Sequence, residues 1–167
     1  MRHVISGFDD LLDANRVYSD GFSLGGINPR AARGLGVVTC IDSRIEPLSM
    51  LGLKPGDAKI LRNAGARVTD DVLRTLVAAV HLLGVNRVAV VQHTNCAMVC
   101  ASPDEMRAAV AASARRSADD WDPMVITDHA EVLAADLARI ATHPLLAGRV
   151  ELGAFVYDVD TGLLRPM

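Results

Sequence analysis

Two short stretches of this 167-residue chain carry side chains that bind metal ions well. The stretch GVVTCIDSR places Cys40, Asp42 and Arg44 behind an apolar run, and RVAVVQHTNCAM places His93 and Cys96 behind another. Thiolate and imidazole are ligands that zinc prefers, and a catalytic zinc site keeps three protein ligands and leaves a fourth position open. The sequence therefore predicts one zinc site with Cys40, His93 and Cys96 as its ligands.

The fourth position of this predicted site has two competing uses. Asp42 is close enough to Cys40 in the chain to become the fourth ligand, whereas the planar guanidinium of Arg44 matches a carboxylate bidentately. Asp42 therefore either closes the site or pairs with Arg44 and leaves room for water. Metal coordination lowers the pKa of water from about 15.7 toward about 7, which gives a nucleophile near neutral pH. Because two thiolates donate charge to zinc, we expect a weaker effect than with three neutral histidines.

These ligands meet only if the two stretches end neighbouring strands. The β-branched run at residues 37–39 is typical of a strand that is covered on both faces, and residues 86–93 form a similar run. Residues 58–65 and the alternating segment after Val150 indicate two further strands. Ligands of α/β sheets gather at the carboxyl ends of the strands, so we expect Cys40 and His93 at the same edge.

Helical patterns alternate with these strands. The clearest runs from Thr69 to Leu83, where Thr69 is suited to cap the start and Gly84 to end it. We expect a first helix capped by Ser6, a helical turn near residues 46–52, and two later helices at about 103–117 and 127–142. The pattern predicts an α/β fold, in which residues 1–167 form a single layered domain with a mostly parallel central sheet flanked by helices.

Composition narrows the classes of function. A net charge of -3 without a Lys/Arg cluster argues against nucleic acid or an anionic membrane as partner. The N-terminus lacks an apolar secretory stretch, and no segment approaches the roughly 20 apolar residues that span a bilayer. Three cysteines in such a chain favour metal or thiol chemistry in a reducing compartment, so we expect a cytoplasmic protein.

The two motifs together resemble those of the β-class carbonic anhydrases, in particular the short bacterial and archaeal members. The segment CIDSR matches a Cys-x-Asp-x-Arg motif and HTNC matches His-x-x-Cys. The segments RNAGARVTDDVLRTL and YDVDTGLL are also similar to parts of that family. The similarity covers most of the chain and is best from about Val37 to Met98.

The resemblance implies a four-stranded parallel core with a C-terminal edge strand and reversible hydration of CO₂ to bicarbonate by a zinc-bound hydroxide. It implies one Zn²⁺ per chain on Cys40, His93 and Cys96. Asp42 and Arg44 would be the catalytic dyad, with Asp42 a zinc ligand only in a closed state. The resemblance also implies a homodimer or higher oligomer, in which the early helix, about residues 6–20, packs on the partner subunit.

Two positions depart from the family pattern, which often reads Asp before the second cysteine and Gly after it. This chain has Asn95, which removes a negative charge, and Ala97, which we expect to limit positive-φ geometry. A hydrolase of CS₂ or COS on the same zinc site is therefore a second hypothesis. A third is a zinc-stabilised sensory or interaction protein that Asp42 closes permanently, although the presence of Arg44 argues against it.

The remaining cysteine and histidines have plainer interpretations. Cys100 follows Cys96 by four residues, and we interpret it as a buried inert thiol, with a regulatory disulfide as the alternative. Asn63 and Gly65 are placed to shape the floor of the pocket. The other histidines have no companion ligands nearby in the sequence and are interpreted as packing or surface residues: His3, His81, His129 and His143.

Overall fold

A five-stranded sheet with the strand order β2-β1-β3-β4-β5 organises residues 7–167, the part of the chain that this computed structural model describes. Four neighbouring strands run parallel, and β5 pairs with β4 in the antiparallel sense. The predicted α/β fold, with its four-stranded parallel core and C-terminal edge strand, is confirmed. The strands are β1 (Leu35–Cys40), β2 (Ala58–Asn63), β3 (Arg87–His93), β4 (Glu151–Tyr157) and β5 (Leu164–Pro166).

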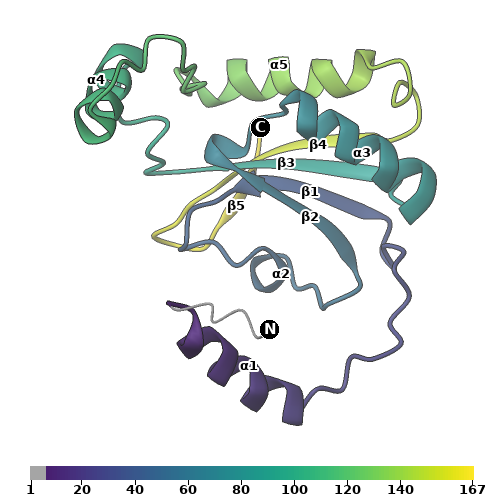
Figure 1. Cartoon of the computed structure of the whole chain (residues 1–167). Helices are drawn as coiled ribbons and strands as arrows, with labels where there is room; N and C mark the ends of the chain where they lie inside the picture. The colour runs from purple at the N-terminus through teal and green to yellow at the C-terminus, as the bar shows by residue number, and fades with distance from the viewer. Residues whose placement is uncertain (1–6) are drawn as a thin grey trace.

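The helices are distributed unevenly around the sheet (Figure 1). Helices α3 and α5 cover one face, the short α2 lies on the other side, and α1 stands away from the sheet. A short 3-10 helix, η1, follows β2 directly. The helices are α1 (Asp9–Asp20), α2 (Pro47–Met50), η1 (Ala64–Ala66), α3 (Asp70–Leu83), α4 (Pro103–Ala114) and α5 (His129–Thr142).

Helix α3 begins and ends where its capping residues predict. The Thr69 side chain accepts a hydrogen bond from the Val72 N–H, which satisfies one of the free donors at the helix start. Gly84 adopts the left-handed conformation at φ 78° and closes the other end. Its buried face, which includes Leu76, packs on the sheet and helps to hold the strands in register.

The main core lies between the sheet and the two covering helices. Val88 and Val90 project from β3 into this core and meet Leu133 and Ile140 of α5. Because side chains alternate along a strand, His93 then points to the opposite face of the sheet from Val90. The core thus fixes which face of β3 carries the predicted ligand.

Three helix ends differ from the expectations. Helix α1 begins at Asp9 with Phe8 in the capping position and without a side-chain cap, while Ser6 lies outside the described residues. Helix α4 ends at Ala114, three residues early, because Arg115 turns into the left-handed conformation. Helix α5 begins at His129, since Asp128 accepts a hydrogen bond from the Glu131 N–H and so caps it.

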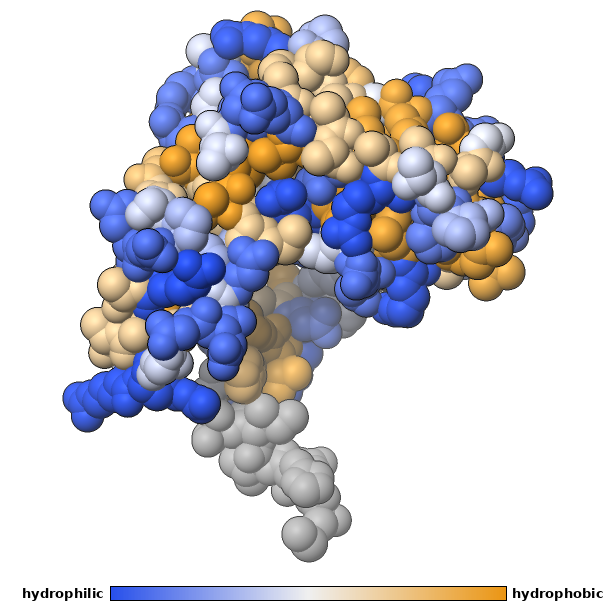
Figure 2. All heavy atoms as spheres, turned by 90° about the horizontal axis from the view of Figure 1, so that it is seen from above, coloured by the Kyte–Doolittle hydropathy of each residue, from blue (hydrophilic) through white to orange (hydrophobic). Residues whose placement is uncertain are grey.

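The outer surface mixes polar and apolar residues. Figure 2 shows hydrophilic and hydrophobic side chains interspersed over the face seen from above. Within residues 7–167, none of the helices has the length and apolar character that crossing a bilayer requires. Helix α1 differs from this mixed surface, because none of its residues is buried. Together with the preceding residue Phe8, it exposes the apolar side chains of Leu11, Leu12 and Tyr18.

A buried ion pair ties the segment after β2 to α5. Arg67 Nε donates to Asp136 Oδ2 at 2.8 Å, and Arg67 Nη1 donates to the Met124 carbonyl at 2.9 Å. The two charged side chains are only 13% and 2% exposed. The Asn63 side chain bonds both backbone groups of Arg67 and closes the turn around η1. This network holds the turn that leads from β2 toward the predicted metal site.

Removal of one partner of this pair should destabilise the protein strongly. Asp136→Ala leaves the Arg67 charge buried and unpaired, so the free energy of unfolding should fall by about 3–5 kcal/mol. Urea denaturation at a fixed protein concentration measures the loss. Asp71→Ala, which breaks the exposed pair with Arg74, is the matched control and should cost much less. Equal losses in the two variants would contradict a structural role for the buried pair.

Candidate metal centre

The three predicted ligands converge at the carboxyl edge of the sheet. Cys40 is the last residue of β1 and His93 the last residue of β3, and these two strands are parallel neighbours. One ligand atom from each of Cys40, His93 and Cys96 lies within 4.8 Å of the other two, and all three residues are buried. The prediction that the two motifs meet at one edge is therefore confirmed.

The arrangement of these donor atoms fits a zinc ion. Cys40 Sγ lies 4.0 Å from Cys96 Sγ, and two sulfurs bound tetrahedrally at about 2.3 Å from zinc would be about 3.8 Å apart. His93 Nδ1 bonds the Thr94 carbonyl at 2.8 Å, which leaves the lone pair on Nε2. Among the described residues, His93 Nε2 is buried and has no hydrogen-bond partner. A metal ion would supply the missing partner of this nitrogen.

The sulfur atoms of Cys40 and Cys96 lie within hydrogen-bond distance of each other, at 4.0 Å. The hydrogen bond from Cys96 holds the pKa of the Cys40 thiol well below its usual value, and it raises the pKa of Cys96, which keeps the proton. The backbone N–H of Gly65 also donates to Cys40 Sγ at 3.4 Å. Because a metal binds thiolates, loading of the site should release this proton.

Gly65 is the residue that lets the turn after β2 approach the sulfur. Its backbone has φ 77°, a conformation that side-chain-bearing residues rarely adopt. An added Cβ would also lie 3.2 Å from the Met98 side chain and 3.4 Å from Ile126. We expected from the sequence that Gly65 shapes the pocket floor. The structure adds a specific contact, because the Gly65 N–H donates to the Cys40 sulfur.

Asp42 and Arg44 form a bidentate pair beside the three ligands. Arg44 Nε donates to Asp42 Oδ1 at 3.0 Å and Arg44 Nη2 donates to Asp42 Oδ2 at 2.7 Å. These hydrogen bonds, together with one from the Arg44 backbone N–H, hold the pKa of the Asp42 carboxyl well below its usual range. Asp42 Oδ2 is also 3.9 Å from His93 Nε2. The ionised carboxylate therefore lies within reach of both the guanidinium and the ligand cluster.

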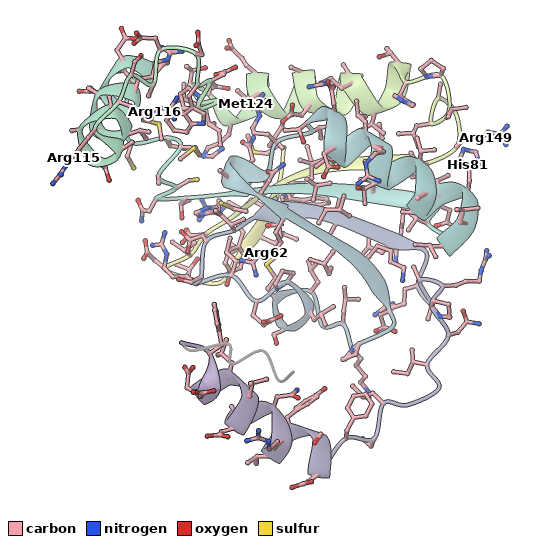
Figure 3. All side chains as sticks on the ribbon, viewed as in Figure 1. Arg62, His81, Arg115, Arg116, Met124 and Arg149 are labelled. Atoms are coloured by element: carbon pink, nitrogen blue, oxygen red, sulfur yellow. The ribbon has the colours of Figure 1, made fainter. Side chains whose placement is uncertain are left out.

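Arg62 supports the same segment and was missed from the sequence. Its Nε donates to the Cys40 carbonyl at 2.8 Å and its Nη2 donates to the Asp42 carbonyl at 2.7 Å (Figure 3). Arg62 lies on β2 opposite Thr39 of β1, so it reaches the end of the neighbouring strand. Only the pairing of β2 with β1 identifies this contact, because no spacing in the sequence marks it.

The loop of the second motif has one residue with positive φ, and Cys100, which follows this loop, is exposed, against our expectation. The residue with positive φ in this loop is Asn95, at 54°, and not residue 97. Asn tolerates the left-handed region better than most residues, so Asn95 suits the loop, and Ala97 places no constraint of this kind on it. Cys100 is exposed, whereas we expected a buried thiol, and its sulfur donates to the Cys96 carbonyl at 3.1 Å.

The other described histidines make hydrogen bonds at partly buried or surface positions, in agreement with the interpretation from the sequence. His129 Nδ1 bonds Gln92 Oε1 at 2.7 Å, and His81 Nε2 bonds the Leu145 carbonyl at 2.8 Å. His143 Nδ1 accepts from the Leu145 N–H. His3 lies outside the described residues. Within residues 7–167, the cluster at Cys40 is the one group of three such ligands.

Apolar side chains surround the ligand cluster. Ile45 is 2% exposed and packs against Cys40 and Cys96, with Met50, Met98 and Tyr157 around them. These walls give the site a low-polarity surrounding in which charges interact more strongly than in water. Such a site suits a small, uncharged reactant that meets an anionic nucleophile.

Comparison with known proteins connects this geometry to a family. Residues 35–164 match the family model described as carbonic anhydrase. Beta-carbonic anhydrase 1 of Mycobacterium tuberculosis is 35% identical over 157 residues, which cover 94% of this chain and 95% of the relative. Carbon disulfide hydrolase of Saccharolobus solfataricus is 27% identical over 156 residues, covering 80% and 76%. The crystal structure of carbonic anhydrase from Streptococcus mutans gives a TM-score of 0.90 at 36% identity and covers 98% of this chain and 99% of that one.

The predicted ligands determine which substitutions should reduce the metal content of the protein. Cys96→Ser and His93→Ala each remove one of three ligands, so the metal retained after dialysis against a chelator should fall by about tenfold or more. Elemental analysis of the dialysed protein measures this. Cys100→Ser is the matched control and should keep the wild-type content of about one zinc per chain. Metal that survives in Cys96→Ser, or disappears in Cys100→Ser, would contradict the ligand assignment.

Proposed function

The chain belongs to the β-carbonic anhydrase family, which makes it a lyase-type enzyme, and we propose that it catalyses the reversible hydration of carbon dioxide to bicarbonate and a proton. One observation carries the proposal. A carboxylate–guanidinium pair lies beside three buried soft ligands, one of which, His93, has a ring nitrogen without a partner among the described residues. This combination suits a metal-assisted hydration better than a purely structural metal site.

Cys40, His93 and Cys96 would hold one zinc ion per chain. When bound, zinc supplies Lewis acidity that lowers the pKa of a water and makes it nucleophilic near neutral pH. The Thr94 carbonyl fixes the His93 ring so that Nε2 faces the other ligands. The Gly65 N–H and the backbone held by Arg62 keep Cys40 in place, so the chain presents its donors already oriented.

Asp42 and Arg44 would act as the catalytic pair. Because Arg44 keeps Asp42 ionised and fixes both of its oxygens, the carboxylate can accept a hydrogen bond from the reacting water and orient it. If Asp42 leaves Arg44, it becomes a candidate fourth metal ligand and closes the site. The observed pairing of Asp42 with Arg44 supports the open arrangement and argues against a permanently closed sensory protein.

The substrate follows from the walls of the site and from the relatives. Carbon dioxide is small and weakly polar, which suits the apolar surrounding formed by Ile45, Met50 and Met98. One relative is a carbon disulfide hydrolase, so CS₂ or COS on the same site is the alternative. The higher identity to a carbonic anhydrase, over nearly the whole of both chains, favours carbon dioxide.

Location and partners are part of the proposal. Because oxidation of the ligand thiols would destroy the site, we place the chain in a reducing compartment, the cytoplasm. The net charge of -3 gives no support for a nucleic-acid partner. We treat residues 1–167 as one functional domain, in which the N-terminal helix serves assembly and the sheet edge serves catalysis.

Helix α1 supports a homodimer or higher oligomer. Its apolar residues are exposed, with Leu11 at 59% and Phe8 at 54%, and none of its residues is buried. An amphipathic helix that buries nothing in its own chain gains stability only against another surface. Packing of α1 across a second copy of the chain would cover this apolar face.

Turnover should depend on Arg44 far more than on other arginines. In stopped-flow assays of CO₂ hydration, Arg44→Ala should lower kcat/KM by about 100-fold, because Asp42 loses the group that orients it. Arg44→Lys should lose less, since it retains the charge without the bidentate geometry. Arg116→Ala, at an exposed arginine that Figure 3 labels near α4, is the matched control and should match wild type.

The same assay separates the competing functions. Zinc-loaded wild-type protein that hydrates no CO₂ at any pH up to about 9 would refute the proposal, since the water should be ionised by then. Faster turnover of CS₂ than of CO₂ would assign the chain to the alternative hydrolase. Loss of activity in Arg116→Ala equal to that in Arg44→Ala would show that charge alone, and not the pair, matters.

Assembly should depend on one face of α1. Leu11→Glu combined with Leu12→Glu places charges on the apolar face and should shift the mass measured by light scattering toward the monomer. Val17→Glu is the control, because Val17 is 75% exposed and lies about 120° around the helix from Leu11. An unchanged mass in the double variant, or an equal shift in Val17→Glu, would argue against this interface.

A further inference from the structure

The turn between β4 and β5 docks on the loop that carries the second ligand motif. The Thr94 N–H donates to the Tyr157 carbonyl at 3.0 Å, and the Val159 N–H donates to Thr94 Oγ1 at 3.1 Å. Next to these, Asn95 Nδ2 donates to Asp160 Oδ2 at 3.1 Å. Three hydrogen bonds therefore join the end of β4 and the turn after it to the two residues between His93 and Cys96.

The turn presents the Asp160 carboxylate from a fixed backbone. Asp158 Oδ1 accepts from the N–H groups of Asp160 and Thr161 at 3.0 and 3.1 Å. The Gly162 N–H donates to the Asp158 carbonyl at 2.8 Å, and Arg165 bonds the second oxygen of the Asp158 carboxylate. With its own backbone held in this way, Asp160 is a firm anchor for a side chain of the neighbouring loop.

The anchored loop in turn holds the catalytic guanidinium. Arg44 Nη2 donates to the Asn95 carbonyl at 3.0 Å and, from the same nitrogen, to Asp42 Oδ2 at 2.7 Å. Asn95 has φ 54°, and this one residue is held through its side chain by Asp160 and through its carbonyl by Arg44. Contacts thus run from Asp160 through Asn95 and Arg44 to Asp42.

We propose that Asp160 is a positioning residue for the Asp42–Arg44 pair, and that Asn95 and Asp160 work as a matched donor and acceptor. The inference rests on the proposed function, in which that pair orients the reacting water. The amide at position 95 is required because a carboxylate there would face Asp160 at hydrogen-bond distance and be repelled. Asn95 is thus suited both to the left-handed backbone and to the charge of the opposite turn.

A charge swap tests the matched pair. In the zinc-loaded protein, Asn95→Asp should lower kcat by about tenfold or more. The two carboxylates repel each other, which moves the loop and shifts the carbonyl of residue 95 away from Arg44. Adding Asp160→Asn restores a donor opposite an acceptor, so the double variant should return to within about threefold of wild type. Asp120→Asn removes an exposed carboxylate elsewhere and should change nothing.

A second readout follows Arg44 directly. The Nε–H of Arg44, which donates to Asp42, is identified in NMR spectra by its loss in Arg44→Lys. In Asn95→Asp this proton should exchange with water about tenfold faster than in wild type, and the double variant should restore its protection. Zinc content should stay the same in all of these variants, because a metal ligand is changed in none of them.

The outcomes separate this inference from the proposed function. If the wild-type protein does not hydrate CO₂, but the Arg44 proton exchanges faster in Asn95→Asp and not in the double variant, the proposed function is overturned and the positioning role stands. Wild-type protein that hydrates CO₂ while Asn95→Asp keeps normal kcat and normal exchange would overturn the positioning role alone. A double variant no better than Asn95→Asp, or one that has lost its zinc, would also overturn the matched pair.

Discussion

The parallel pairing of β1 with β3 is the constraint on which the site depends. The register sets Thr39 opposite Val91, so Cys40 and His93 leave the sheet together at its carboxyl edge. A slip of one residue would turn the His93 side chain into the core that contains Val90. The apolar packing under α3 and α5 therefore does more than stabilise the chain, because it selects the one register that assembles three ligands from two distant motifs.

The ligand cluster is an arrangement that the protein alone satisfies poorly. The buried sulfurs of Cys40 and Cys96 are 4.0 Å apart, and the Nε2 atom of His93 has no partner within the described part of the chain. Buried polar groups of this kind reduce stability unless something pairs with them. The segment that follows β2, next to Cys40, is held in place by the Arg67–Asp136 ion pair and by the hydrogen bond from the Gly65 N–H. A bound cation would relieve both of these unfavourable features at once.

The sequence predicted those features that local patterns determine. Thr69 and Gly84 end α3 by short-range hydrogen bonding, and the β-branched strands have a period that needs no distant partner. The motifs themselves located the three side chains that are placed to hold a metal, because residue type restricts metal binding so strongly. Features that depend on register were missed. Arg62 acts on β1 from a different strand, and the exposure of Cys100 depends on a loop whose path the sequence does not determine.

Asp42 lies between the Arg44 guanidinium and the ligand cluster. Its carboxylate is 2.7 Å from Arg44 Nη2 and 3.9 Å from His93 Nε2, so under the proposed function a small movement would bring it from the guanidinium to the ligand cluster. Every contact that restrains Arg44 therefore favours the open arrangement. The Asn95 carbonyl is such a contact, and the Asp160 charge adds to it across the loop. Under the proposed function, residues that never touch the reactants would therefore influence the population of the open arrangement, because they determine how tightly Arg44 is held.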